Sequence, residues 1–212
     1  MLRFRSRCRS VAGATIRSVS RFLNRTASIG PNDYAARPYK YFGRGSIISW
    51  PTGNMYGERW ISIGEDTMIA SDVTLSAGMV PGQEMLTDPV VMIGDRCLIG
   101  RGSSIVGHYR IDIGNDVFTG MNVYITDQNH GYEDPQTPIG IQDPLDDPVV
   151  IGDGSWIGTG AVVLPGARIG RNCVIAANSV VRGEFPPHSV IAGVPGKVVR
   201  AYDGMKWNRP QS

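Results

Sequence analysis

The stretch from Val149 to Val181, VVIGDGSWIGTGAVVLPGARIGRNCVIAANSVV, decides the fold. A period of six runs through it, and such a period matches neither the 3.6-residue turn of a helix nor the two-residue alternation of a strand. The stretch is therefore a supersecondary repeat. Aliphatic residues occupy every sixth position, namely Ile151, Ile157, Val163, Ile169, Ile175 and Val181. Smaller or apolar residues stand two positions before each, namely Val149, Ser155, Ala161, Ala167, Cys173 and Ser179.

Each hexapeptide supplies one short strand and one turn, and three hexapeptides close one triangular coil. Residues two apart on a strand point the same way, so the paired positions face the inside of the prism. Gly152, Gly158 and Gly170 follow the aliphatic position, where a side chain would collide or a positive φ is needed. Stacked coils would merge the aliphatic rows into one core. The pattern predicts an all-β fold, a parallel β-helix.

The same register recurs in 61–75, 91–105 and 111–125, which predicts about five coils in all. At about 4.8 Å per stacked strand, the prism would be on the order of 20 Å tall. Two segments rich in Pro, Gly and acids, 77–90 and 127–148, interrupt the array. Insertions in a solenoid leave it at the corners, and long loops of this kind often carry function.

The flanks of the array differ from it in composition. Residues 1–30 carry seven Arg and no acid, and their apolar residues between Val11 and Leu23 line one helical face. A basic amphipathic helix of this kind lies on an anionic membrane surface or packs on a partner. Residues 31–60 form an irregular lead-in that caps the prism, 61–200 the β-helix domain, and 201–212 a short tail. The aromatics of the lead-in lack a basic run between them, which argues against nucleic-acid binding.

The composition of the chain indicates the cellular compartment of the protein. The chain has no run of eighteen apolar residues, so no transmembrane helix is expected. Three Cys do not form a disulfide framework, and Cys97 and Cys173 fall on inward rows as buried, reduced thiols. We therefore expect a cytoplasmic protein, with peripheral contact at the inner face of the membrane through residues 1–30.

The remaining chemistry centres on three histidines: His108, His130 and His188. The segment Ile125–His130, ITDQNH, together with the W-I-G and A-G-V-P elements, resembles the hexapeptide-repeat acyltransferases, specifically their galactoside and maltose O-acetyltransferase branch. The resemblance spans residues 91–200. It implies a left-handed β-helix, a homotrimer, acetyl-CoA or another acyl-CoA as co-substrate, no metal, and His130 as the catalytic residue.

The resemblance also implies a mechanism of direct transfer in a ternary complex. Neutral His130 would take the proton of an acceptor hydroxyl, whose oxygen attacks the thioester carbonyl. The same imidazole would then protonate the departing CoA thiolate. Backbone N–H groups near the thioester would hold the oxyanion.

By the same resemblance, CoA lies between two prisms of the trimer. Thr159 and Ala177 would contact its pantetheine arm through their backbone, and three cations would lie near its phosphates, namely Arg182, Lys197 and Arg200. The chain departs from the family here, because Arg182-Gly183 stands where a Thr-Lys pair is common.

The positions expected to bind the acceptor differ further from the family pattern. Gly100 and His108 stand where galactoside acetyltransferases carry an Asn and an Asp for the sugar, so a galactoside is not expected. A sugar hydroxyl on a glycan, glycolipid or precursor fits better. Candidates for hydrogen bonds to the acceptor are His108, Asp127, Glu133 and Asp134.

Three alternatives stay open. An N-acyltransferase acting on an amino or nucleotide sugar would use the same fold. A γ-carbonic anhydrase also uses this prism, but it needs three His on zinc, two of them in an H-x4-H spacing. His108 and His130 are 22 residues apart. A non-catalytic scaffold is the third alternative, although a scaffold would not need a His at the start of a loop.

Overall fold

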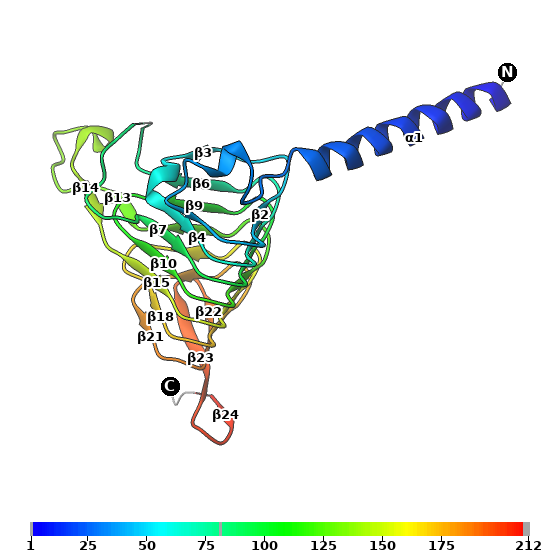
Figure 1. Ribbon diagram of the computed structural model, residues 1–212. Coiled ribbons are helices and arrows are strands. Elements are labelled where there is room, and N and C mark those ends of the chain that lie inside the picture. The colour runs from blue at the N-terminus through cyan, green and yellow to red at the C-terminus, as the bar shows by residue number, and fades with distance from the viewer. Residues whose placement is uncertain (1, 81, 210–212) are drawn as a thin grey trace.

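The computed structural model describes residues 2–80 and 82–209. The chain forms a tapering three-sided prism of short parallel strands, and one helix projects from its wide end (Figure 1). In each coil the chain passes along three faces in turn, which we call faces 1, 2 and 3. The edges between them are the 1/2, 2/3 and 3/1 edges.

Each face is one parallel sheet. Face 1 contains β1 (Tyr41–Phe42), β4 (Ile61–Ile63), β7 (Val91–Ile93), β10 (Ile111–Ile113), β15 (Val149–Ile151), β18 (Arg168–Ile169) and β21 (Glu184–Phe185). Face 2 contains β2 (Ile47–Ile48), β5 (Met68–Ile69), β8 (Leu98–Ile99), β11 (Phe118–Thr119), β16 (Trp156–Ile157), β19 (Val174–Ile175) and β22 (Ser189–Gly193). Face 3 contains β3 (Met55–Tyr56), β6 (Thr74–Ala77), β9 (Ser104–Gly107), β12 (Tyr124–Thr126), β17 (Val162–Val163) and β20 (Val180–Val181).

The prism has six complete coils and a partial seventh, one coil more than the sequence pattern predicts. The additional coil is β1 to β3, inside the segment expected to be an irregular cap. Its pairing is regular, with Phe42 opposite Ile63 and Met55 opposite Leu75. The pattern missed it because Phe42 and Met55 replace the aliphatic residues on two of its faces, although Ile48 keeps the aliphatic position on face 2. The 3-10 turns η1 (Tyr34–Ala36) and η2 (Glu58–Trp60) flank this coil.

The inward rows form one continuous core. Ile63, Ile93, Ile113, Ile151 and Ile169 lie in register on face 1, and each is buried. Burying such a side chain stabilises the fold by about 1.5–3 kcal/mol. The prediction for the cysteines is confirmed, since Cys97 and Cys173 are buried free thiols within this core.

Two glycines show why the turns need them. A Cβ on Gly158 would lie 2.5 Å from the amide nitrogen of Ala177 in the next coil, so no side chain fits there. Gly160, two residues later, has a φ of 70°. Collision therefore explains the glycine directly after the aliphatic residue, and the left-handed backbone comes later in the turn.

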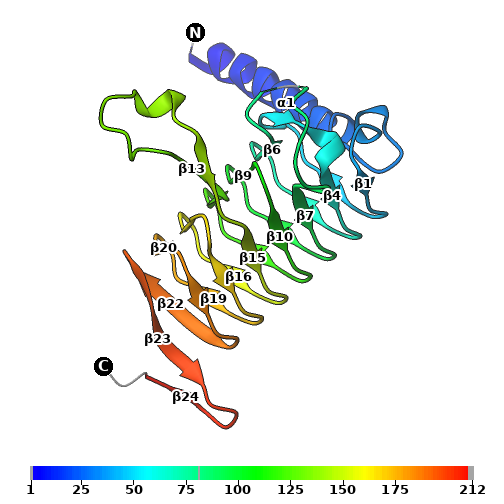
Figure 2. The same cartoon turned by 90° about the vertical axis from the view of Figure 1, so that its left-hand side faces the viewer.

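The two ends of the chain differ from expectation. The helix α1 (Leu2–Thr26) extends beyond the helical stretch predicted between Val11 and Leu23, and it points away from the prism (Figures 1 and 2). At the other end, β23 (Gly196–Tyr202) and β24 (Trp207–Asn208) extend face 2 with antiparallel pairing, so residues after 200 are more than a tail. No helix in the described chain has the length and hydropathy needed to cross a membrane.

Three excursions leave the prism on consecutive coils at the same 3/1 edge. They are the loop between β6 and β7, the bulge 108–110 between β9 and β10, and the long segment between β12 and β15. The long segment forms an antiparallel hairpin of β13 (Gln128–His130) and β14 (Pro144–Asp146), with the turn η3 (Ile139–Ile141) between them (Figure 2). Their common edge brings together residues far apart in sequence.

Candidate active site

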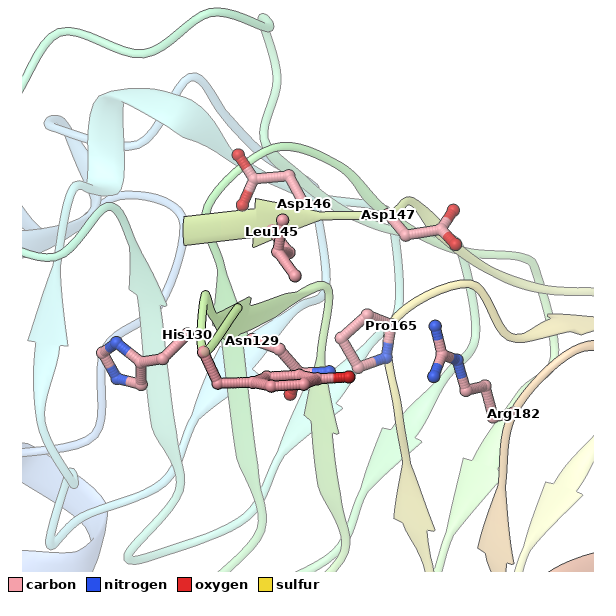
Figure 3. A pocket seen from close by; sticks show the side chains of 8 residues that line it. Asn129, His130, Leu145, Asp146, Asp147, Pro165 and Arg182 are labelled. Atoms are coloured by element: carbon pink, nitrogen blue, oxygen red, sulfur yellow. The ribbon is translucent and has the colours of Figure 1, made fainter. Parts of the chain in front are cut away.

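His130 lies between two clefts at the 3/1 edge. The first, here the Arg182 cleft, has a volume of about 550 Å³ (Figure 3). Its lining consists of Asn129, His130, Tyr132, Leu145, Asp146, Asp147, Pro165 and Arg182. The second, here the Tyr124 cleft, measures about 390 Å³ and shares Asn129 and His130 with the first. Its other lining residues are Tyr56, Gly78, Met79, Val106, Gly107, His108, Tyr124, Thr126 and Gln128.

The ring of His130 is exposed and stands at the end of β13, opposite Pro144. Figure 3 shows it on one side of the Arg182 cleft, with Pro165 and Arg182 on the other side. Within residues 2–80 and 82–209, no side chain or backbone group hydrogen-bonds this ring. Both ring nitrogens are therefore open to a substrate, and the hairpin backbone sets the position of the ring.

His108, in contrast, has a hydrogen-bond partner at each ring nitrogen. Its Nδ1 lies 2.9 Å from both carboxylate oxygens of Asp146 on β14. Its Nε2 lies 3.3 Å from the amide nitrogen of Gln83, in the loop before β7. Only 15% of its side chain is exposed. His108 thus joins all three excursions at the Tyr124 cleft.

Asp127 holds the bulge that carries His108. Its buried carboxylate accepts the backbone N–H groups of His108 and Tyr109 at 2.8 Å and of Arg110 at 2.5 Å. Burial raises the pKa of this carboxyl, although the three N–H donors oppose the rise. The expectation that Asp127 binds the acceptor does not fit this position, because its oxygens face backbone groups of its own chain.

Glu133 and Asp134 lie farther along the excursion. Both are exposed, and neither lines the two clefts that share His130. The Asp134 carboxylate accepts the hydroxyl of Thr137 at 2.6 Å and the N–H of Gln136 at 2.9 Å, which holds its pKa below the usual range. The structure therefore places these two acids outside both clefts that contain His130.

The residues expected to bind CoA fall into two groups. Thr159 and Ala177 are exposed and stacked at the 2/3 edge, where the Asn178 N–H donates to the Thr159 carbonyl at 2.9 Å. Lys197 and Arg200 are exposed on β23. The turn before β23 is tied to the same edge, because the Gly193 N–H donates to the Ser179 hydroxyl at 3.1 Å.

Arg182 belongs to the other edge, because it follows β20 and lines the His130 cleft. His130 and Thr159 thus stand at opposite edges of face 3. A strand rises about 3.3 Å per residue, so the five residue-to-residue steps from Thr159 to Leu164 put the edges roughly 15 Å apart. One prism alone does not bring His130 to the Thr159 and Ala177 edge.

The sequence missed several residues of the site. Gln83, Tyr124 and Asp146 become neighbours of His108 or His130 only through the shared 3/1 edge. Their one sequence signal is that two of them lie in the non-repeating segments.

The third histidine, His188, lies at the 1/2 edge and packs edge-on against Tyr202, with ring centroids 6.3 Å apart. In the described chain, no three His, Cys, Asp or Glu side chains converge as a metal site.

Two family models match the repeats. Residues 148–183 match the bacterial transferase hexapeptide (six repeats), and residues 90–127 match the hexapeptide repeat of succinyl-transferase. A putative lipopolysaccharide biosynthesis O-acetyl transferase of Escherichia coli is 37% identical, over 54% of this chain and 62% of its own length. The galactoside O-acetyltransferase of Escherichia coli is 31% identical, over 68% of this chain and 64% of its own length. The chain thus spans less than two thirds of each of these relatives.

Solved structures share the fold. An N-acyltransferase from Bacillus cereus, AntD, in complex with dTDP and 3-hydroxybutyryl-CoA, has a TM-score of 0.68 at 18% identity and covers 82% of this chain and 89% of its own. A hexapeptide-repeat acetyltransferase from Vibrio cholerae has a TM-score of 0.56 at 24% identity, over 91% and 89% of the two chains. At these identities the likeness concerns the fold alone. The prediction of an all-β, left-handed parallel β-helix with one N-terminal helix is confirmed.

Proposed function

The chain belongs to the hexapeptide-repeat transferase family, and from this premise we propose that it is an acyl-CoA-dependent O-acyltransferase acting on a sugar or glycan hydroxyl. Acetyl-CoA is the proposed donor. One observation carries the proposal: His130, with an open ring, lies between two clefts. A transfer between two substrates needs such an arrangement, because one base must reach both the acceptor hydroxyl and the thioester.

In the proposed reaction the imidazole of His130 is first a base and then an acid. Its unprotonated nitrogen takes the proton of the acceptor hydroxyl while that oxygen forms a bond to the thioester carbonyl carbon. The tetrahedral intermediate collapses with cleavage of the C–S bond, and the imidazolium returns the proton to the thiolate. An ester and free CoA leave. A ring with no hydrogen-bond partner in the described part of the chain is free to exchange protons with both substrates.

The Tyr124 cleft supports a sugar as the acceptor. It combines the rings of Tyr56 and Tyr124 with the polar groups of Thr126 and Gln128. Sugar rings present apolar C–H faces and a rim of hydroxyls, which suit aromatic and hydrogen-bonding side chains respectively. Two relatives bear the names of O-acetyltransferases, and this favours a hydroxyl over an amine as the nucleophile.

We further propose that the enzyme acts as a homotrimer in which neighbouring chains share each active site. The 2/3 edge, with Thr159 and Ala177, would supply the acyl-CoA site, and His130 would come from the neighbour. Face 2 supports association, because an exposed apolar column runs along it in register through successive coils. The column consists of Ile47, Met68, Leu98, Phe118 and Trp156.

The helix α1 is proposed to rest on an anionic membrane surface. Its exposed apolar residues Ile16, Val19 and Phe22 lie on one side, and Arg17 and Arg21 lie on the other. A helix with this distribution buries its apolar side at a lipid interface, while its basic residues attract anionic headgroups. Such contact would bring the active site to membrane-linked glycan acceptors.

The function is tested with the purified full-length protein. Acetyl-CoA is incubated with a panel of sugars, glycosides and lipid-linked glycans, and free thiol is followed with a chromogenic disulfide. We expect thiol release that depends on one class of sugar acceptor, and a loss of roughly 10²–10⁴-fold in His130→Ala, the usual contribution of a general base. The product bond is then treated with mild base, which cleaves an ester and leaves an amide intact.

His188→Asn is the matched control, because it removes a histidine at a remote edge and suits the φ of 58° there. It should keep full activity. A product stable to base would replace the O-acyltransferase with an N-acyltransferase. Failure of the folded protein to bind either CoA or acetyl-CoA in calorimetric titration would overturn the acyltransferase proposal altogether.

A further inference from the structure

The contacts of Gln83 assign the position of the proton on His108. The backbone N–H of Met79 donates to the Gln83 side-chain oxygen at 2.8 Å, which fixes the orientation of the amide. The amide NH2 of Gln83 therefore points at Nε2 of His108, 3.3 Å away. A donor at that position requires a lone pair on Nε2. The proton of the neutral ring must then be on Nδ1, which faces the Asp146 carboxylate at 2.9 Å.

Asp146 links the His108 ring to the β13–β14 hairpin. It stands opposite Gln128 in the β13–β14 pairing, and the Gln128 amide also donates to it at 3.2 Å. Two residues beyond Gln128, the same strand ends at His130, opposite Pro144. The backbone of His108 is in turn fixed by Asp127. A continuous set of hydrogen bonds thus runs from the loop before β7, through the His108 ring, to the strand that carries His130.

We propose that His108 is a positioning residue that clamps the β13–β14 hairpin to the prism and thereby sets the place of the His130 ring. The proposal rests on the function proposed above, in which His130 is the base. It replaces the expectation that His108 hydrogen-bonds the acceptor, because both ring nitrogens of His108 already have partners in the chain. Among residues 2–80 and 82–209 no side chain hydrogen-bonds the His130 ring, so its position depends on this clamp.

The first test measures the tautomer of His108 and the environment of the His130 ring by NMR, without any enzymatic turnover. The full-length protein is labelled with ¹⁵N-histidine, and its three histidines are assigned by single substitution. Long-range ¹H–¹⁵N spectra at neutral pH should show His108 as one tautomer, with a protonated Nδ1 and an unprotonated Nε2. Asp146→Ala should shift the ring signals of His130, and Asp143→Asn, on the same excursion, should leave them in place. A ring of His108 that exchanges between tautomers, or unmoved His130 signals, would refute the clamp.

The second test is kinetic. Misplacing a catalytic group by about 1 Å costs on the order of 10²-fold, so His108→Ala and Asp146→Ala should each lower kcat by roughly 10–100-fold. The KM for acetyl-CoA should change little, because no substrate contact is removed. His108→Asn should recover most of the rate, since the Asn amide N–H stands as many bonds from Cβ as Nδ1 does. The double Ala variant should be no slower than the slower single variant, as expected for residues that act as one unit.

The two tests separate the two proposals. An inactive wild-type protein with the expected histidine spectra would reject the enzymatic proposal and keep the clamp as a structural one. An active wild-type protein in which His108→Ala raises only the KM for the acceptor would return His108 to the acceptor site and overturn the positioning role. Thermal unfolding of each variant serves as the check that the prism remains folded.

Discussion

The site separates two histidines by what surrounds them. His108 has partners at both ring nitrogens, so its proton is fixed. His130 has an exposed ring with no partner in the described chain. Acid–base catalysis requires a group that accepts a proton and gives it back, which a fully bonded ring does poorly. The open ring is thus the better candidate for the base, and the bonded ring for the support.

Substitution of Asp127 is predicted to lower the stability of the fold. All three of its partners are backbone N–H donors, so Asp127→Asn would turn an NH2 group toward one or two of them. Leaving buried donors unpaired costs about 1–3 kcal/mol each, and we expect a loss of roughly 3 kcal/mol in total. In a chain of this size such a loss lowers Tm by about 6–12 °C, measured by calorimetry or circular dichroism. Asp143→Asn is the control, because this exposed carboxylate has no hydrogen-bond partner among the described residues. An unchanged Tm for Asp127→Asn would show that the bulge does not need the carboxylate.

At the scale of elements, the groups to which we assign functions lie on the excursions and on α1, outside the regular coils of the prism. The β13–β14 hairpin carries His130, and α1 contributes no strand to the prism. The end of α1 is nevertheless anchored, because Ile29 bridges to Ile48 of β2 and the Trp50 N–H donates to Ser28. A surface that bound α1 would therefore be held near the wide end of the prism (Figure 1).

Membrane contact by α1 is tested with vesicles. Each Arg near an anionic surface contributes about 1 kcal/mol, so Arg17→Gln with Arg21→Gln should weaken binding to vesicles rich in phosphatidylserine by roughly 30-fold. Binding is measured by co-sedimentation at low salt. Arg171→Gln with Lys206→Gln removes the same charge from the prism and its C-terminal extension, and should bind like the wild type. Equal losses in both variants would point to net charge rather than to α1.

At the scale of the whole molecule, the proposed reaction requires a second copy of the chain, because the proposed base and the proposed acyl-CoA site lie at opposite edges of face 3. Within one prism, the roughly 15 Å between these edges exceeds the reach of a side chain. In the proposed homotrimer, a rotation about a common axis would place the 3/1 edge of one copy beside the 2/3 edge of the next. Such an interface is heterologous, and it closes into a ring when the rotation is a third of a turn.

Sharing of sites between chains predicts rescue by mixing. His130→Ala and Ala177→Trp should each be inactive alone, the second because its side chain fills the pantetheine groove. The two variants are co-expressed with different tags, and mixed trimers are isolated by both tags. Each mixed trimer would combine one intact His130 edge with one intact groove, so about a third of the wild-type activity per trimer should return. Mixed trimers without activity would show that each chain keeps its own site.

The sequence by itself determined the prism. A six-residue period leaves little freedom, because each repeat must close one side of a coil and stack on the next. The repeats in residues 91–105 and 149–181 therefore predicted the β-helix, its core rows and its two buried cysteines. The coil in residues 41–56 was not predicted, because Phe42 and Met55 stand opposite Ile63 and Leu75 and leave Ile48 as an isolated match to the aliphatic row. Its coil forms because backbone hydrogen bonds to the next coil do not depend on the side chain.

Only the tertiary structure decided what surrounds the histidines. Gln83, His108 and Asp146 are separated by 25 and 38 residues along the chain, and no periodicity relates them. They meet because three excursions leave the same edge on successive coils. The structure likewise placed Arg182 in the cleft that contains His130 and not at the edge of Thr159, because the residues after a face-3 strand and those before it lie at opposite edges. Local patterns specify the strands, and the path of the chain around the prism specifies which loops become neighbours.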